Sequence, residues 1–373
     1  MPTLGDVTDL LEQWFPAAHA DSWDAVGLVC GDPAADVRRI LLAVDPVTAV
    51  ADEAVADGAQ LLVCHHPLFL KGVHGVAATD PKGRIVHRLL AAGCGLFTAH
   101  TNADSPAGGV SDSLALALGL VHVRPLEADP APAYDKIVVF APTDSAEGIR
   151  AALAGVGAGA IGDYDSCTFT TPGEGRFRPL DGAHPTIGEV GRVESVEEVR
   201  IETVCPRHLR AESVAALVAA HPYEEPAYDV VPLAELDEPD RGSGRIGRLG
   251  SPMTLADFAA HVSEVLSETA HGVRVAGDPD QLIETVGLCG GAGDFLLDRA
   301  RAAGVDVYLT SDLRHHPASE LREHGAPALV DVAHWAAEAT WLPVLQRRLT
   351  DALGATVEVR VSTTNTDPWT FRV

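Results

Sequence analysis

The sequence predicts an α/β protein whose layered α/β/α core, built on a mostly parallel sheet, is interrupted by an inserted α+β domain. Short continuous apolar runs alternate with helical patterns at both ends of the chain, which is typical of buried parallel strands and their crossover helices. The middle of the chain follows a different order of elements. The length of 373 residues also exceeds the ~250–300 residues that a single core usually reaches.

The first part of the core is expected at residues 1–125. Continuous apolar residues predict buried strands at Ile40–Val44, Leu61–Cys64 and Gly95–Ala99. Apolar residues at helical spacing predict helices at Val7–Trp14, Val47–Asp57, Val86–Ala92 and Ser111–Leu118. This alternation predicts a mostly parallel sheet that is covered by helices.

The inserted domain is expected at residues 130–235. It is bounded by a proline-rich acidic stretch, Pro125–Pro132, which predicts a linker, and by a polar stretch, Glu235–Ser243, which predicts a hinge. Between them the sequence predicts strands at Lys136–Phe140, Tyr164–Thr171, Glu198–Val204 and Ala227–Pro232, and helices at Ala146–Ala154 and Leu209–Ala220. The order β-α-β-β-α-β is the ferredoxin-like arrangement.

The second part of the core is expected at residues 240–373, where the alternation returns. The predicted helices are Leu255–Leu266, Leu296–Ala303 and about His334–Leu349. The predicted strands are Gly272–Gly277, Thr285–Leu288, Val305–Leu309, Ala328–Val332 and Thr356–Ser362.

The charge of the chain narrows the range of partners. A formal charge of −26 argues against a broad nucleic-acid-binding face and against binding to anionic membranes, because both partners are negatively charged. No apolar run reaches the ~18 residues of a membrane span, and the N-terminus lacks the pattern of a signal peptide. The six cysteines form no CxxC pair. We therefore expect a cytoplasmic protein with reduced, buried cysteines.

Three clusters of candidate metal ligands follow predicted strands. His65 and His66 come directly after Leu61–Cys64, at the end of a strand where α/β proteins bind ligands, although the alternative is that one of them is an exposed loop histidine. The stretch His100–Asp104 follows the next strand; its aspartate offers an oxygen ligand, but the pattern also fits a capped turn. His334 and Glu338 are four residues apart on a predicted helix and so share one face, as surface pairs also do.

Together the clusters offer five ligands, which are His65, His66, Asp104, His334 and Glu338. Nitrogen and carboxylate ligands suit two divalent ions such as Zn, Fe, Mn or Ni. Five side chains leave open positions for water or substrate, which indicates metal-assisted hydrolysis.

Other polar residues are candidates for catalytic or binding roles. His100 can orient a ligand or move a proton, and Asp312 and His316 can transfer protons or contact substrate, although a simple helix N-cap at Asp312 is the alternative. The glycine motif Gly157–Gly162 precedes a strand and therefore does not fit a dinucleotide site. The turn Cys289–Asp294 either presents N–H groups to an anion or is only a tight turn. Glu224 and Glu225 are interpreted as part of a turn or interface.

The motifs SWDAVGLVCG, LLVCHHPLF, TAHTNADS, GGAG, YLTSDLRHH and DVAHWAAE resemble, in this order, those of the Ngg-one-interacting-factor-three-like family. Its bacterial members are labelled GTP cyclohydrolase I type 2 homologues, and GAGAIGDYDSCTFTTPGEGRFRP with HPYEEPAYDVVP is similar to the PII/CutA-like insert of its long members. The resemblance implies a toroidal homohexamer with a dinuclear centre held by the five ligands above. One departure from the family motif is Ala25, which follows Trp23 and Asp24 at a position where the family often has an asparagine.

Two functions follow from this interpretation. The first is a metal-dependent hydrolase for a nucleotide or related heterocycle, for instance one that opens the imidazole ring of GTP, with His100 or His316 moving protons. The alternative is a non-enzymatic metal-binding regulator or adaptor whose insert senses a ligand or docks a partner.

Overall fold

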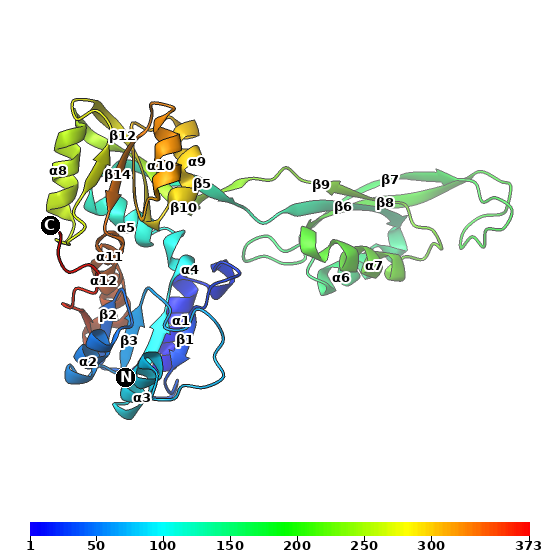
Figure 1. Ribbon diagram of the computed structural model, residues 1–373. Helices are drawn as coiled ribbons and strands as arrows, with labels where there is room; N and C mark the ends of the chain where they lie inside the picture. The colour runs from blue at the N-terminus through cyan, green and yellow to red at the C-terminus, as the bar shows by residue number, and fades with distance from the viewer. The chain divides into compact units, whose positions relative to one another are not determined.

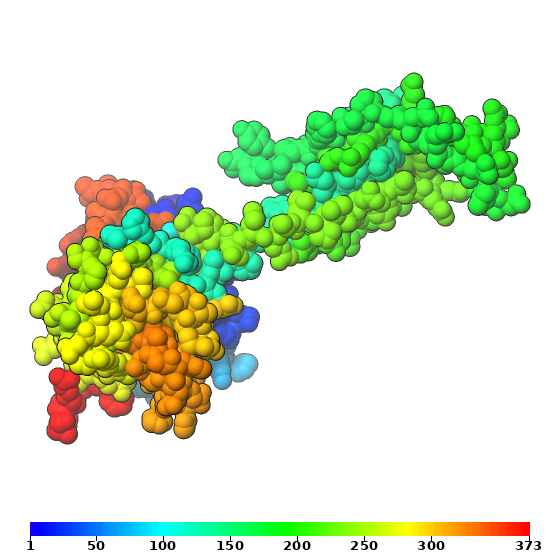
Figure 2. Space-filling model, turned by 90° about the horizontal axis from the view of Figure 1, so that it is seen from above, coloured from blue at the N-terminus to red at the C-terminus, as the bar shows by residue number.

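The computed structural model describes residues 1–373 and divides them into two compact units. Unit 1 comprises Met1–Asp129 and Pro239–Val373, and unit 2 comprises Pro130–Glu238. In the space-filling view, unit 1 combines blue-to-cyan atoms with yellow-to-red atoms, whereas unit 2 is green (Figure 2). Unit 1 is therefore built from both ends of the chain.

Unit 1 contains two sheets where the sequence suggested one. The first sheet has the order β1-β4-β3-β2-β15, with strands β1 (Gly27–Cys30), β2 (Arg39–Ala43), β3 (Leu61–Cys64), β4 (Gly95–Thr98) and β15 (Glu358–Val361). All neighbours are parallel except β1, which runs antiparallel to β4. The C-terminal strand β15 thus extends the N-terminal sheet beside β2 (Figure 1). This sheet carries helices α1 (Leu4–Trp14), α2 (Thr48–Ala56) and α3 (Pro81–Ala91).

The second sheet has the order β11-β14-β13-β12-β10-β5. Its strands are β5 (Val121–Pro130), β10 (Asp237–Thr254), β11 (Arg274–Ala276), β12 (Leu282–Ala292), β13 (Val307–Ser311) and β14 (Ala328–Val332). The central strands β12, β13 and β14 are parallel, whereas β10 pairs antiparallel with β12 and β11 pairs antiparallel with β14. Its helices are α5 (Val110–Ala117), α8 (Leu255–Val265), α9 (Leu297–Ala303) and α10 (His315–Arg322).

The stretches predicted as a linker and a hinge contain the boundaries between the two units, but they are not irregular as expected. Pro125–Pro132 lies largely in β5, and Glu235–Ser243 lies largely in β10. β5 is the edge strand beside β10. Prolines and charged residues are tolerated on an edge strand, because one side of its backbone needs no partner, so such a strand lacks the apolar pattern of a buried one.

The predicted helix His334–Leu349 is also wrong in one respect, because it is two helices. α11 (His334–Ala339) ends before Thr340, and α12 (Trp341–Leu353) follows. Pro343 lies in the first turn of α12, where its missing N–H is tolerated, but it disfavours continuation of the preceding helix.

The two helices α11 and α12 pack against both apolar cores of unit 1. Trp341, which is fully buried, belongs to the core of the first sheet together with α1. Ala336 and Ala337 belong to the core of the second sheet with α5 and α8. Trp335 packs against both cores, so α11 holds a fixed position between the two sheets.

Unit 2 contains strands β6 (Tyr134–Pro142), β7 (Thr168–Phe177), β8 (Glu194–Pro206) and β9 (Tyr228–Pro232), and helices α6 (Ala146–Gly155) and α7 (Arg210–Ala220). The sheet order is β7-β8-β6-β9, and every neighbouring pair is antiparallel. Both helices cover the same face of this sheet (Figure 1). In the whole chain, no helix has both the length and the apolar character that crossing a bilayer requires.

Candidate metal centre

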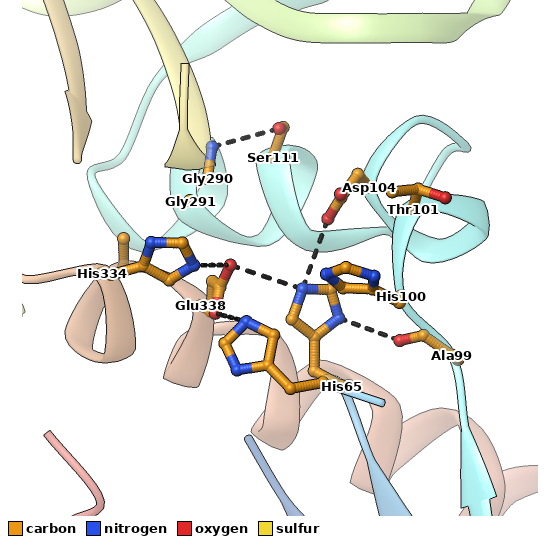
Figure 3. A network of polar contacts seen from close by, with 12 residues as sticks. His65, Ala99, His100, Thr101, Asp104, Ser111, Gly290, Gly291, His334 and Glu338 are labelled. Carbon is orange, nitrogen blue, oxygen red and sulfur yellow. Dashed lines mark hydrogen bonds and ion pairs between the residues drawn. The ribbon is translucent and has the colours of Figure 1, made fainter. Parts of the chain in front are cut away.

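Side chains that follow three strands converge at one place in unit 1 (Figure 3). His65 and His66 come directly after β3, and His100 comes two residues after β4. Asp104 ends the short helix α4 (Thr101–Asp104), and His334 and Glu338 lie on α11, which follows β14. The structure therefore brings all five predicted ligands together with His100, from both sheets of unit 1.

Glu338 lies at the centre of this cluster, and it is only 3% exposed. Its Oε1 is 2.8 Å from His334 Nε2 and 3.4 Å from His65 Nε2. Its Oε2 is 3.0 Å from His66 Nε2. The adjacent residues His65 and His66 thus approach different oxygens of one carboxylate. Asp104 Oδ1 lies 3.5 Å from the same His65 Nε2 atom.

Each of the four histidines is held through Nδ1, which leaves Nε2 directed into the cluster. The Nδ1 contacts are His65 to the Ala99 carbonyl at 2.9 Å, His66 to Asp45 at 2.7 Å, His100 to Asp24 at 2.9 Å and His334 to Asp312 at 2.7 Å. Metal-binding histidines are oriented in this way, because the contact at one nitrogen fixes the ring and directs the other nitrogen toward the ion.

Sequence reasoning missed the orienting roles of Asp24, Asp45 and Asp312. Asp45 directly follows the predicted strand Ile40–Val44, so its place at a strand end was a usable signal. Asp24 also accepts hydrogen bonds from the N–H and Oγ1 of Thr101, at 3.1 and 2.6 Å, and so fixes the start of α4. Asp312 was considered for proton transfer, but the structure uses it to hold His334.

His316 is the one candidate that the structure does not bring to the cluster. It is exposed on α10, and its ring centroid lies 5.2 Å from that of His315. His100, by contrast, forms a possible ligand group with His65 and His66, whose ligand atoms all lie within 4.8 Å of one another. A second such group is His66, His334 and Glu338.

The cluster has buried polar atoms that nothing in the protein satisfies. His65 Nε2, Asp104 Oδ1 and Glu338 Oε2 are all buried without a hydrogen-bond partner. The 3.0 Å contact of Glu338 Oε2 with His66 is close enough for an ion pair but is not aligned as a hydrogen bond. Such atoms are rare in native proteins. Three such atoms in one cluster of imidazole nitrogens and carboxylate oxygens fit a site for divalent first-row metal ions.

The charges of the cluster shift the pKa of its members. Burial lowers the pKa of His66, but Glu338 and Asp45 outweigh burial and raise that pKa to about 10. Burial likewise lowers the pKa of His334, and Glu338 with Asp312 raises it to about 11. Burial raises the pKa of Glu338, but the three histidines around it hold that pKa well below its usual value. Metal ions would therefore have to displace protons from these rings at neutral pH.

Asp104 and His100 are shifted in other directions. Burial raises the pKa of Asp104 to about 6, with Glu338 adding to burial and His65 opposing it. Burial, followed by the nearby His65, lowers the pKa of His100 despite its bond to Asp24. Because the Nδ1 proton of a neutral His100 is donated to Asp24, its Nε2 can accept a proton at neutral pH.

A glycine turn forms one wall of the cluster. Gly291 has a left-handed φ of +71°, and a Cβ there would lie 2.7 Å from Glu338 Oε1 and 3.4 Å from His334 Nε2. The N–H of Gly290 donates to Ser111 Oγ at 3.3 Å (Figure 3). Of the two interpretations of Cys289–Asp294, the tight turn fits better, because this N–H is already bonded and the turn lets the backbone approach Glu338 closely.

The C-terminal segment beside the cluster gave no signal in the sequence. Glu53 accepts hydrogen bonds from Ser362 Oγ at 2.5 Å and from Thr364 Oγ1 at 2.7 Å. Thr366 donates to Asp45, the residue that holds His66. Asp367 follows, with a buried Oδ2 that has no partner and a pKa that burial raises. The segment therefore fixes the position of Asp45 from outside the cluster.

The fold and the site define an α/β protein of two sheets with a buried histidine–carboxylate cluster suited to metal ions. The family model of Duf34/NIF3 (NGG1p interacting factor 3) matches residues 2–368, and the chain belongs to this family.

Named relatives and solved structures agree with this assignment. A Mycobacterium tuberculosis protein named "GTP cyclohydrolase 1 type 2 homolog" is 51% identical over 369 residues, covering 98% of this chain and 96% of the relative. A Bacillus subtilis protein of the same name is 37% identical over 368 residues, with coverage of 98% and 97%. The crystal structure of a Bacillus cereus protein related to NIF3 matches with a TM-score of 0.69 at 37% identity, covering 100% of this chain and 99% of that one. A Staphylococcus aureus structure matches with a TM-score of 0.79 at 28% identity, covering 99% of each chain.

Proposed function

We propose that this protein is a metal-dependent hydrolase with a dinuclear centre that acts on a nucleotide or a related heterocycle. The observation that carries the proposal is the set of buried, unpartnered nitrogen and oxygen atoms that face one another between the two sheets. The name shared by the relatives, GTP cyclohydrolase 1 type 2 homolog, supports a nucleotide as the substrate class.

The ligands of the two ions would be His65, His66, Asp104, His334 and Glu338. Two divalent ions of Zn, Fe, Mn or Ni would supply Lewis acidity and lower the pKa of water. Five side chains do not saturate two ions, so positions for water or substrate remain.

His100 is better placed than His316 to move a proton. Asp24 holds its Nδ1, and its Nε2 lies in a group with His65 and His66. His316 lies exposed on α10, away from these groups. A general base must reach the proton that it takes, so we propose His100 for this step.

The proposal extends to the assembly and to unit 2. We propose a toroidal homohexamer, with unit 2 as a ferredoxin-like, PII/CutA-like insert. The element order of unit 2 and its antiparallel sheet support the second part. Light scattering coupled to size-exclusion chromatography tests the first, and a mass other than six chains would refute it. The cytoplasmic location expected from the sequence stays a prediction.

The test combines elemental analysis with a turnover screen on protein purified without chelators. We expect divalent metal in the protein, turnover of GTP or another nucleotide, and loss of turnover in His66→Ala. His316→Ala is the matched control, because it removes an exposed histidine outside the cluster, and it should retain turnover. If protein that carries its metal turns over no nucleotide, the proposed substrate class is wrong.

A non-enzymatic regulator is the second candidate function, and a cavity within unit 2 favours it, because a ligand-sensing domain needs a place for its ligand.

A further inference from the structure

Unit 2 contains a cavity of about 240 Å³. Its lining residues all lie between Phe140 and Ala227, and none of them belongs to the metal cluster. The cavity lies where β7 and β6 end, between the segment that follows β7 and the loop that precedes β9. Its apolar walls include the rings of Phe140, Phe177 and Tyr223. Its charged groups are two arginines, Arg176 and Arg178, and three carboxylates, Glu198, Glu224 and Glu225. Aromatic walls with a few polar groups are typical of small-molecule sites.

The Tyr223 wall of the cavity is held in place by hydrogen bonds. His221, which is 8% exposed, contacts the Phe140 carbonyl through Nε2 at 3.0 Å and accepts the N–H of Tyr223 at Nδ1, at 3.1 Å. The Tyr223 hydroxyl donates to Glu198 Oε1 at 2.9 Å. The ring of Phe177 lies 5.8 Å from that of Tyr223. The aromatic walls and the carboxylate are therefore positioned before any ligand arrives.

The segment that follows β7 is tied to the loop that carries Tyr223. The N–H of His184 donates to Glu224 Oε1 at 3.0 Å, and Thr186 Oγ1 donates to the Pro222 carbonyl at 2.7 Å. A Cβ at Gly175 would lie 2.1 Å from Glu198 Oε2, so a larger residue there would displace this carboxylate from its present position. The loop that carries Glu224, interpreted from the sequence as a turn, thus closes one side of the cavity.

The charged groups of the cavity have capacity for a ligand. Glu198 bonds Tyr223 through Oε1, and its Oε2 has no hydrogen-bond partner in the chain. Arg176 and Arg178 are exposed residues that line the cavity, and neither side chain pairs with a carboxylate. A guanidinium that is not paired with a carboxylate can bind a phosphate through two parallel hydrogen bonds.

We propose that this cavity binds a nucleoside phosphate. The flat base packs against the ring of Phe177 or that of Tyr223, which are tilted by 56° to each other, since such a ring accepts any base by its face. Glu198 Oε2 accepts hydrogen bonds from the N–H edge of the base, which favours guanine, whose ring N–H and amino group lie side by side. Arg176 and Arg178 bind the phosphates. The proposal concerns unit 2 alone and does not depend on the metal centre.

The test is isothermal titration calorimetry of the full-length protein with GTP, ATP, guanosine and inorganic phosphate. The measurements use the His334→Ala background, in which the candidate metal centre is disabled. GTP should bind, and more tightly than ATP. Glu198→Gln should weaken GTP binding by about tenfold or more, because it removes a charged acceptor. Arg178→Ala should weaken GTP binding to a similar degree but change guanosine binding less than about twofold.

Arg192→Ala is the matched control, since Arg192 lies on the same unit outside the cavity and is 73% exposed. It should leave every affinity unchanged. Circular dichroism checks that each variant is folded. If Glu198→Gln unfolds, Tyr223→Phe replaces it, because it removes only the hydroxyl that positions Glu198 and should also weaken GTP binding.

The inference is overturned if GTP, ATP and guanosine all fail to bind at about 1 mM. It is also overturned if neither Glu198→Gln nor Arg178→Ala weakens GTP binding. A third contrary result is GTP binding that is present in the native chain and lost in His334→Ala. The last result would assign the nucleotide to the metal centre and leave the proposed hydrolase intact. Binding by unit 2 together with no turnover by metal-loaded protein would refute the hydrolase and support the inference.

Discussion

Glu338 should be the residue on which metal binding depends most strongly. It is 3% exposed, and its two oxygens lie 2.8 to 3.4 Å from the Nε2 atoms of three histidines. Glu338→Gln keeps the shape of the side chain but removes its charge. It also places an amide NH₂ group where one oxygen faces the histidines. We therefore expect this variant to fold and to bind metal poorly.

The expected loss of metal affinity in Glu338→Gln can be estimated by comparison with Asp45, which contacts a candidate ligand but is not one itself. Asp45 bonds His66 Nδ1 at 2.7 Å and can influence a metal ion only through that ring. Losing such an orienting partner usually weakens metal affinity about 10- to 100-fold. A direct carboxylate ligand should exceed the upper end of this range. We thus expect more than about 100-fold for Glu338→Gln, which is roughly 2.7 kcal/mol, and about 10- to 100-fold for Asp45→Asn.

The assay is a competition titration of metal-stripped protein with a chromophoric chelator, using Zn²⁺ and Mn²⁺, together with elemental analysis of the purified variants. Asp351→Asn on the exposed face of α12 is the control and should bind like the native chain. The reasoning is refuted if Glu338→Gln binds Zn²⁺ and Mn²⁺ with affinities within about threefold of those of the native chain. It is also refuted if Asp45→Asn weakens metal binding more than Glu338→Gln does.

Three further predictions concern the surroundings of the same cluster. Metal binding should release protons near pH 7, because the rings of His66 and His334, with pKa values of about 10 and 11, carry protons there. The metal affinity should therefore rise with pH, while the number of protons released falls. Calorimetry in buffers of different ionisation enthalpy measures the release, and zero release near pH 7 would contradict this prediction. Gly291→Ala places a Cβ at a φ of +71° and against Glu338, so it should lower the free energy of unfolding by about 1–2 kcal/mol and also lower the metal content. Denaturant titration and elemental analysis measure the two effects. An unchanged metal content would refute the close approach of Gly291 to Glu338. Trp341→Ala should lower the free energy of unfolding by about 3–5 kcal/mol in denaturant titrations, because Trp341 is fully buried. Trp369 is 69% exposed, so Trp369→Ala should change this free energy by less than about 0.5 kcal/mol. Equal effects of the two variants would contradict the packing argument.

The candidate ligands could be predicted because each follows a buried strand within a few residues of its carboxyl end. The runs Leu61–Cys64 and Ala328–Val332 are continuous apolar segments, and both are strands in the structure. A polar residue that directly follows such a run is placed at the ligand-binding edge of a sheet by the strand itself. The four-residue spacing of His334 and Glu338 then fixes their common face on α11.

The rest required contacts between residues far apart in the chain. Nothing in the sequence of Glu358–Val361 indicates that it pairs with Arg39–Ala43 rather than with the strands nearer to it in the chain. This pairing, with β5 joining the other sheet, is why unit 1 has two sheets. Asp24 was not recognisable for the same reason, because its partner His100 is distant in sequence and no local pattern marks either one as half of a pair.

The electrostatics of the cluster indicate that it is built for cations rather than for its own ion pairs. Burying Glu338 costs several kcal/mol unless positive charge lies close by. In the metal-free protein that charge comes from protonated histidines, whose rings are crowded, with centroids 5.1 Å apart for His65 and His66 and 5.3 Å apart for His66 and His334. The histidines therefore repel one another, and His65 Nε2 and Asp104 Oδ1 still lack partners. Divalent ions would take the place of the repelling protons and give His65 Nε2 and Asp104 Oδ1 partners, so metal binding should raise the free energy of unfolding, and more so at higher pH.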